Sequence, residues 1–308
     1  MSRVLVTGGG GFIGSNLVRA LLERGDDVRV LDNFSTGHRG NLEGLDVEIV
    51  EGELRSYERV HNAVRGVEVV HHLGALGSVP RSVQDPLTTN AVNVDGTLNV
   101  LLAARDEGVR RVVYASSSSV YGSSAPLPAS ESSPVDPISP YGVAKLAAER
   151  YCVSFSRVYA SFETVVLRYF NVFGPRQNPR SQYAAAVPLF ISTVAEGRPV
   201  TIFGDGEQSR DFTFVENVVA ANLAAADASG ANGRIFNVAA GAPNSVNALV
   251  ETVGRLLGKE VERQHEPPRP GDIRDSFADV SAAHEVLRWE PAIGFEDGLR
   301  RTIDALLA

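Results

Sequence analysis

Tyr141 and Lys145 are the residues of this chain best suited to acid and base chemistry. Ser139 and Pro140, which precede them, are typical of an N-cap and a first helical position, so the two side chains stack one turn apart on one helix face. A free tyrosine, with a pKa of about 10, is ionised in about one molecule in a thousand at pH 7, at a cost of about 4 kcal/mol. A tyrosinate base therefore needs nearby positive charge, which Lys145 can supply.

A run of hydroxyl groups, Ser116 to Ser119, ends the apolar segment 112–115. Ligands of an open α/β sheet bind at the carboxyl ends of its strands, where such serines can orient a substrate hydroxyl. A Tyr/Lys pair at helical spacing fits an ordinary surface helix when it stands alone. The serine-rich strand end is the context that favours a catalytic interpretation.

Glycines at positions 8, 11 and 14 lie between an apolar strand, residues 3–7, and a helical pattern. Such a turn lets the backbone approach a pyrophosphate, which the N–H groups at the helix start bind. Asp32 follows a second strand, 28–31, and comes 18 residues after Gly14, near the spacing of about 20 expected for a carboxylate that binds ribose hydroxyls. Asn33 comes next rather than an arginine, so the sequence predicts an NAD site rather than an NADP site.

Further apolar segments at 47–50, 67–72, 112–115 and 164–167 alternate with helical patterns, which is typical of a parallel sheet covered on both faces. The predicted fold class is α/β: a Rossmann-type doubly wound parallel sheet with a smaller α/β substrate-binding lobe. Glycine and proline become denser after about residue 170, as in recognition loops. We expect an NAD-binding domain over 1–170, to which part of 213–240 returns, and a substrate-binding lobe over 171–308.

Composition narrows the class of protein. The 308 residues carry 29 basic and 37 acidic side chains, a net charge of -8, which disfavours the cationic surface that nucleic acid requires. Cys152 is the only cysteine, which is typical of a reducing setting without disulfides. The sequence shows no secretory signal and no run of about 18 apolar residues. We expect a cytoplasmic protein that binds neither nucleic acid nor membrane.

Four motifs together resemble the extended short-chain dehydrogenase/reductase superfamily: the glycine turn, Ser117, Tyr141-Gly-Val-Ala-Lys145, and Arg-Tyr-Phe-Asn-Val-Phe-Gly at 168–174. The resemblance covers essentially the whole chain and is greatest to NAD-dependent UDP-hexose 4-epimerases. Segments 71–82, 177–179 and 183–188 are most similar to the bacterial UDP-N-acetylglucosamine 4-epimerase branch. The resemblance implies that Tyr141 is the general base and acid. It implies further that Lys145 lowers the tyrosine pKa and holds the nicotinamide ribose, and that Ser117 orients the sugar 4-oxygen.

The same resemblance implies the binding residues. The residues expected to contact NAD are Gly8, Gly11, Phe12, Ile13, Gly14, Asp32, Asn33, Ser35, Gly37, Glu53, Leu54, Leu73, Gly74, Ala75, Asn93, Tyr141, Lys145 and Tyr169. The substrate contacts include arginines suited to bidentate binding of a diphosphate, and comprise Ser78, Ser117, Ser118, Asn171, Arg180, Ala185, Val187, Phe203, Arg210, Arg269 and Asp272. No metal site is expected, because His71 and His72 end an apolar strand without a ligand cluster.

Two positions bear on which hexose is bound. Ala185 leaves room for a 2-acetamido group, although a small side chain does not select for one. Arg180 replaces a more usual small polar residue, and its guanidinium either pairs with the C6 carboxylate of UDP-glucuronate or lies exposed in a loop. Glu53 stands where many relatives have aspartate, and its longer side chain contacts adenine with more rotamer freedom.

The resemblance implies an isomerase that uses NAD to invert C4 of a UDP-hexose through a transient 4-keto sugar. Glucose, N-acetylglucosamine and glucuronate remain open as the hexose. One alternative is another nucleotide-sugar enzyme such as a 4,6-dehydratase, although Ser118 and Ser119 replace the Asp-Glu pair that dehydratases carry. The other is a non-catalytic NAD sensor or an RNA-binding relative, which the intact Tyr/Lys pair and the negative charge disfavour. A homodimer through helices near 98–104 and 144–155 is implied by the resemblance.

Overall fold

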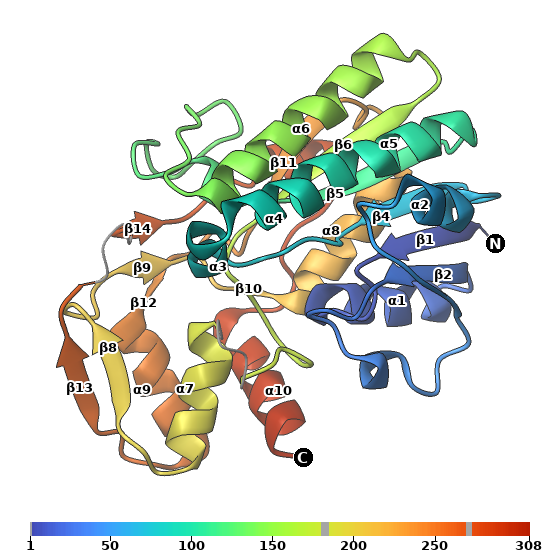
Figure 1. Ribbon diagram of the computed structural model, residues 1–308. Coiled ribbons are helices and arrows are strands. Elements are labelled where there is room, and N and C mark those ends of the chain that lie inside the picture. The colour runs from blue at the N-terminus through green and yellow to red at the C-terminus, as the bar shows by residue number, and fades with distance from the viewer. Residues whose placement is uncertain (1, 180–184, 269–272) are drawn as a thin grey trace.

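Seven parallel strands form the central sheet of the computed structural model, which describes residues 2–179, 185–268 and 273–308 (Figure 1). The order is β11-β6-β5-β4-β1-β2-β3, and every neighbouring pair is parallel. In that order the strands span Arg234–Val238, Glu163–Tyr169, Arg111–Ser117, Val69–His72, Arg3–Thr7, Asp27–Asp32 and Glu48–Glu51. This is the strand order of doubly wound dinucleotide-binding folds, so the predicted α/β Rossmann-type class is confirmed.

Helices cover both faces of the sheet, which is why its inner strands are nearly continuous apolar runs. α1 (Phe12–Glu23) and α8 (Val215–Asp227) pack on one face. α2 (Tyr57–Val64), α5 (Gly96–Asp106) and α6 (Pro140–Val158) pack on the other (Figure 1). The two faces hold separate apolar cores.

Short helices connect β4 to α5. α3 (Val79–Gln84), α4 (Pro86–Asn90) and a π-helical turn, Ala91–Asp95, lead directly into α5. Short helical turns also occur at Arg39–Leu42, Ser118–Val120 and Ala283–Leu287. The segment before α5 brings α3 and α4 against α6, beside the carboxyl ends of the strands.

A second lobe follows β6. Its strands are β7 (Val172–Phe173), β8 (Val200–Phe203), β9 (Ser209–Arg210), β10 (Thr213–Phe214), β12 (Asn244–Ser245), β13 (Arg263–Glu266) and β14 (Asp275–Ser276). They pair as β7 with β10, β8 with β13, and β9 between β12 and β14. α7 (Ala186–Ala195), α9 (Val246–Leu257) and α10 (Phe295–Leu307) pack with these strands around a separate apolar core. Between them the chain returns to the main sheet as α8 and β11, which lies beside β6.

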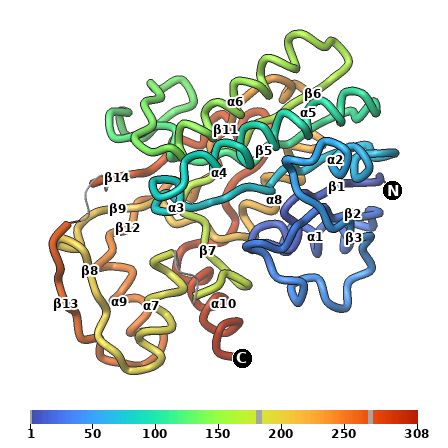
Figure 2. Tube along the Cα trace, in the orientation of Figure 1, coloured from blue at the N-terminus to red at the C-terminus, as the bar shows by residue number. Residues whose placement is uncertain are grey.

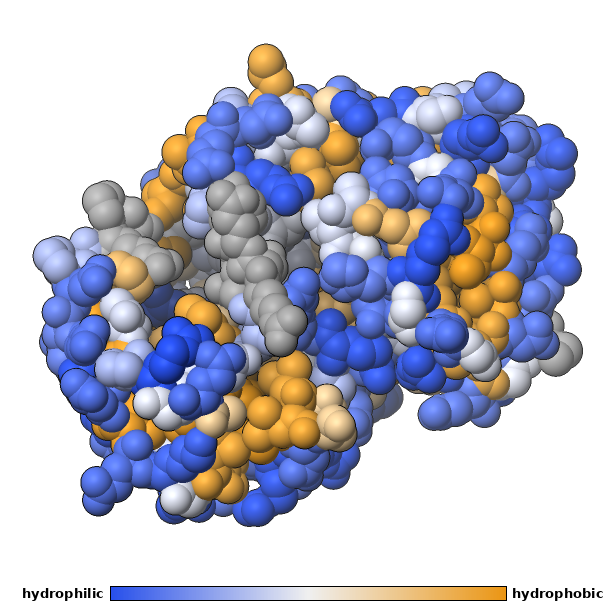
Figure 3. Space-filling view, turned by 60° about the horizontal axis from the view of Figure 1, so that its bottom comes forward, coloured by the Kyte–Doolittle hydropathy of each residue, from blue (hydrophilic) through white to orange (hydrophobic). Residues whose placement is uncertain are grey.

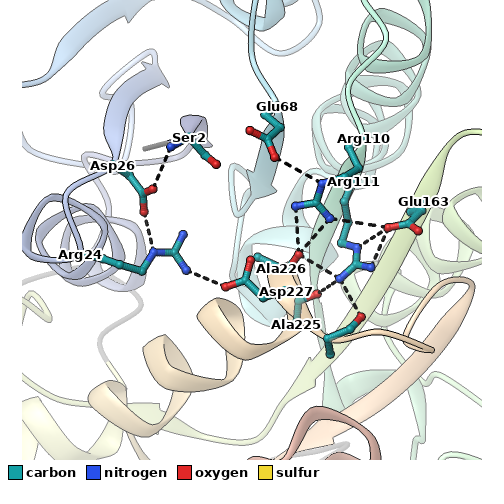
Figure 4. A network of polar contacts seen from close by, with 11 residues as sticks. Ser2, Arg24, Asp26, Glu68, Arg110, Arg111, Glu163, Ala225, Ala226 and Asp227 are labelled. Carbon is teal, nitrogen blue, oxygen red and sulfur yellow. Dashed lines mark hydrogen bonds and ion pairs between the residues drawn. The ribbon is translucent and has the colours of Figure 1, made fainter.

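Arginines fix α8 at the amino-terminal edge of the sheet (Figure 4). Arg111 begins β5, is 4% exposed, and donates to the carbonyls of Ala225, Ala226 and Ala228 at the end of α8. Its guanidinium also pairs with Glu163 at 2.7 Å. A cation at a helix C-terminus satisfies carbonyls that have no partner within the helix. These contacts lie at the amino-terminal edge of the sheet, whereas the predicted site lies at the opposite edge, where the strands have their carboxyl ends.

The chain begins beside β1 and ends at α10 in the second lobe (Figure 2). On the face shown in Figure 3, hydrophilic residues surround separate apolar patches. Among the described residues, no helix combines the length and apolar character needed to cross a bilayer.

Candidate active site

A cavity of about 1080 Å³ lies at the carboxyl ends of β1, β2, β4, β5 and β6. It is lined by the glycine turn, the loop after β2, the ends of β4 and β5, the start of α6 and the segment after β6. Small-molecule sites usually measure about 300–1,000 Å³, so this cavity has room for a dinucleotide together with a second ligand.

The glycine turn fits a pyrophosphate. Gly8 has φ 72°, and a Cβ there would lie 2.7 Å from the backbone nitrogen of Gly74. A Cβ on Gly14 would lie 2.1 Å from the carbonyl oxygen of Gly8. Gly11 is the N-cap of α1 and supplies no side-chain cap, so N–H groups of the first turn are left for an anion. The turn therefore forms the close backbone cradle that NAD requires.

Asp32 joins this turn to the loop after β2. Its carboxylate accepts the N–H of Gly10 at 2.8 Å and the N–H of Phe34 at 2.7 Å. Each oxygen keeps a further lone pair, which ribose hydroxyls can use. Arg39 pairs with Glu51 and Arg55 with Glu53, so the cations of the adjacent loops are already compensated. This distribution of charge suits NAD better than a cofactor with a 2′-phosphate.

The start of α6 places Tyr141 and Lys145 one turn apart on the helix. Ser139 is the N-cap, its hydroxyl accepts the N–H of Gly142 at 3.1 Å, and Pro140 is the first helical residue. Lys145 is 4% exposed and its Nζ donates to the carbonyl of Ala115 at 2.7 Å. The same Nζ lies 6.0 Å from the ring centre of Tyr141. The lysine charge is thus held behind the tyrosine, inside the molecule.

Burial moves the pKa values of this pair in opposite directions. Burial lowers the pKa of Lys145 to about 8, and the charge of Glu149 opposes that shift. Burial raises the pKa of Tyr141, and a hydrogen bond with Ser117 opposes that rise. Lys145 is still charged at pH 7, and its charge favours the ionised form of the tyrosine. The arrangement can accept and return one proton at a substrate hydroxyl.

Most of the predicted site residues line this one cavity. They are Gly8, Gly11, Phe12, Ile13, Gly14, Asp32, Asn33, Ser35, Gly37, Glu53, Leu54, Leu73, Gly74, Ala75, Ser78, Ser117, Ser118, Tyr141, Lys145, Tyr169, Asn171 and Ala185. Asn93 lies behind the lining in the π-helical turn, where its side chain accepts the N–H of Leu76 and donates to its carbonyl. It therefore holds the loop that lines the cavity.

The remaining predictions lie in the second lobe. Val187 is 2% exposed within the core of α7, and Phe203 ends β8. Arg210 in β9 donates to the carbonyls of Ser209 and Arg274. None of these three belongs to the cavity lining. Arg180, Arg269 and Asp272 lie outside the described residues.

In the segment after β6, the sequence predicted Asn171 as a site residue but not Arg176. Arg176 lines the cavity with φ 70° and donates to Asn16 in the first turns of α1, so it places a cation beside the glycine turn. Asn171 has φ 31°, and its buried Nδ2 has no partner among the described residues. Unpartnered buried donors and strained backbone gather at ligand sites. In the sequence, Arg176 could have been singled out by its position, because it follows Gly174 and Pro175 directly after the motif at 168–174.

His72 is a buried structural residue close to the cavity. Its ring nitrogens contact the hydroxyls of Thr7 at 2.7 Å and Thr97 at 3.0 Å, and burial lowers its pKa to about 3. The ring is neutral and joins β1 and β4 to α5.

Comparison with known proteins decides the family. Residues 4–239 match the model of the NAD dependent epimerase/dehydratase family. The chain belongs to this family. It is an NAD-dependent enzyme, as the cavity geometry and the sequence predicted, and it lies within the extended short-chain dehydrogenase/reductase superfamily.

Similar proteins extend over the full chain. UDP-glucose 4-epimerase of Mycolicibacterium smegmatis is 39% identical over 312 residues, which cover 98% of this chain and 97% of the relative. The structure of UDP-N-acetylglucosamine 4-epimerase from Methanobrevibacter ruminantium with UDP-N-acetylmuramic acid has a TM-score of 0.94 at 38% identity, covering 99% and 98% of the two chains. Thermus thermophilus UDP-glucose 4-epimerase in complex with NAD has a TM-score of 0.91 at 38% identity, with 99% of each chain covered.

Proposed function

We propose that this enzyme is an isomerase that inverts C4 of a UDP-hexose through a transient 4-keto sugar. The observation that carries the proposal is that Tyr141, Ser117 and Lys145 lie in the same cavity as the glycine turn. The side chain that can transfer a proton and the turn that can bind a dinucleotide therefore line the same cavity. Several relatives that cover the chain, including those described above, are 4-epimerases of UDP-sugars, which supports the same activity.

Tyr141 takes the proton of the sugar 4-hydroxyl and later returns it. When bound, NAD supplies the oxidant that removes the C4 hydrogen with its electron pair and gives it back. Ser117 orients the 4-oxygen, and the charge of Lys145 favours the tyrosinate that the first proton transfer needs. The reaction is balanced, because the proton and the hydrogen both return to the sugar.

Inversion requires a sugar that turns within the cavity while its diphosphate is held. Ser78, Ser118 and Ala185 are small residues of the lining and leave room for that turn. Asn171 has an unpartnered donor for the diphosphate, and Arg176 offers a nearby cation. Ser118 and Ser119 carry no carboxylate for acid and base steps at C5 and C6, which disfavours dehydration.

The substrate is tested with UDP-glucose, UDP-N-acetylglucosamine and UDP-glucuronate, each followed by proton NMR. We expect at least one to be converted to its 4-epimer and to reach the same mixture from either epimer. A 4-keto-6-deoxy product, or no turnover of any of the three with NAD bound, would contradict the proposal. Arg180→Ala tests whether Arg180 binds the C6 carboxylate of UDP-glucuronate. If it does, the variant loses activity on UDP-glucuronate and keeps its activity on the other two sugars.

We also propose that two copies of the chain form a homodimer through α6, which contains the expected segment 144–155, together with α3 and α4. These helices contact one another and expose Val83, Leu87 and Val143, at 64%, 83% and 54%. Adjacent exposed apolar side chains of this kind are typical of interfaces. By light scattering, we expect the wild type at twice the chain mass of 32.9 kDa and Leu87→Glu shifted towards the monomer. Leu307→Glu, at an exposed apolar residue of α10, is the matched control.

A further inference from the structure

A fully buried ion pair lies behind the catalytic residues. Glu149 in α6 is 0% exposed and Arg168 in β6 is 1% exposed. The guanidinium donates to both carboxylate oxygens, with Nε to Oε1 at 2.9 Å and an Nη to Oε2 at 2.8 Å. Ser116 in β5 donates its hydroxyl to Oε1 at 2.6 Å. One carboxylate therefore joins a helix to two strands.

Each member of this network is next to a residue that lines the cavity. Ser116 precedes Ser117, and Arg168 precedes Tyr169. Glu149 follows Lys145 by one helical turn, on the same face of α6. The carboxylate therefore accepts hydrogen bonds from the arginine, and its charge also acts on the lysine one turn away. A buried pair of this kind is costly to form and needs a reason beyond stability.

We propose that Glu149 is a positioning residue of the active site, which keeps Lys145 in its charged form and fixes the strand ends that carry Ser117 and Tyr169. The inference rests on the proposed function only for the role of Lys145 beside Tyr141. Lys145 is buried, and its carbonyl partner carries no full charge, so the anion one turn away offsets part of its desolvation. Without that anion the lysine is more easily deprotonated and gives less help to the tyrosine.

The other groups around Lys145 do not replace this anion. From β4, the buried His72 is neutral, and from β5, the ring of Tyr114 lies 5.0 Å from Nζ with its hydroxyl un-ionised. From α6, burial raises the pKa values of Tyr141 and Cys152, which disfavours a negative charge on either side chain. On the far side of the carboxylate, Arg168 contributes a cation that also faces Tyr121, with its guanidinium carbon 4.7 Å from that ring centre. Glu149 is therefore the nearby charge that favours the ammonium form.

The chain allows a direct measurement, because Lys145 and Lys259 are its only lysines. With lysine labelled by carbon-13 at Cε, the holoenzyme gives two side-chain NMR signals, and Lys259→Arg assigns them. In the wild type we expect Lys145 to titrate near pH 8. Because this titration requires no turnover, failure of the inference and failure of the proposed function are distinguishable.

Two variants test the inference. Glu149→Gln removes the anion but leaves Arg168 unpaired, so a second variant, Glu149→Gln with Arg168→Met, removes both charges and leaves neither member of the pair buried and unpaired. We expect the Lys145 midpoint to fall in both, and further in the single variant. If a variant turns over substrate, we expect kcat at pH 7 to fall in proportion to the charged fraction of Lys145, with KM changed less than about threefold. That fraction is about nine-tenths for a midpoint near 8, about one half after a fall of one pH unit, and about one tenth after a fall of two.

Glu163→Gln is the matched control, since it breaks the partly buried pair with Arg111 at the opposite edge of the sheet. It lowers the thermal midpoint but leaves the Lys145 titration unchanged. A Lys145 midpoint that stays at its wild-type pH in the folded double variant would overturn the inference, whatever happens to stability.

Discussion

Tyr141→Phe reduces kcat for epimerisation by about 10³-fold, because a positioned acid and base contributes about 10²–10⁴-fold. The phenylalanine ring keeps its place at the start of α6, so only the hydroxyl that exchanges the 4-hydroxyl proton is lost. We expect KM for the UDP-sugar and the affinity for NAD to change less than about threefold, since the variant removes an interaction of the transition state. Steady-state kinetics with the sugar that turns over fastest measures the effect.

Tyr57→Phe is the control for this experiment. Its hydroxyl bonds Asp106 at the surface of α2, outside the cavity, so activity stays at the wild-type level. Epimerisation by Tyr141→Phe at close to the wild-type rate would remove Tyr141 from the chemistry and leave the serine hydroxyls of the lining, Ser117 among them, as the remaining candidates.

Gly14→Ala destabilises the protein by about 2 kcal/mol or more and weakens NAD binding at least about 100-fold, although alanine ordinarily stabilises a helix by about 1 kcal/mol over glycine. The reason is the added Cβ, which would lie 2.1 Å from the carbonyl oxygen of Gly8 and 2.9 Å from the Cα of Gly9. Both contacts are backbone, so the turn itself has to open. Thermal denaturation and a fluorescence titration with NAD measure the two effects.

Gly40→Ala is the matched control, because no atom lies within 4 Å of a Cβ placed there. We expect its thermal midpoint and NAD affinity to equal those of the wild type. A stabilised Gly14→Ala variant with normal NAD affinity would show that the turn does not act as the cradle.

Features set by local sequence were predicted well. The cap at Ser139, the proline that follows it and the one-turn spacing of Tyr141 and Lys145 all depend on neighbouring residues, and the structure shows them as expected. The glycine turn is equally local, since its spacing reflects the steric limits of one strand-to-helix connection. The parallel, doubly wound sheet was predicted because apolar strands that alternate with helices have few allowed arrangements.

Features set by distant contacts were not predicted. Glu149 meets Arg168 across 19 residues and Ser116 across 33, and neither spacing leaves a pattern in the sequence. Asn93 stays a predicted NAD contact, and its hydrogen bonds with the backbone of Leu76, which the π-helical turn before α5 brings near, were not predicted. The place of Arg210 depends on how β9 pairs with β12 and β14, and short strands of that kind carry little periodicity.

The central claim is a reversible oxidation at C4 within one enzyme molecule. It is tested most directly with a UDP-hexose that carries deuterium at C4, incubated with the holoenzyme in ordinary water. We expect the 4-epimer to form with deuterium retained at C4, because the hydrogen that leaves the sugar returns to the opposite face of the same carbon. Product in which the deuterium has exchanged with water, or has moved to C6, would contradict the account.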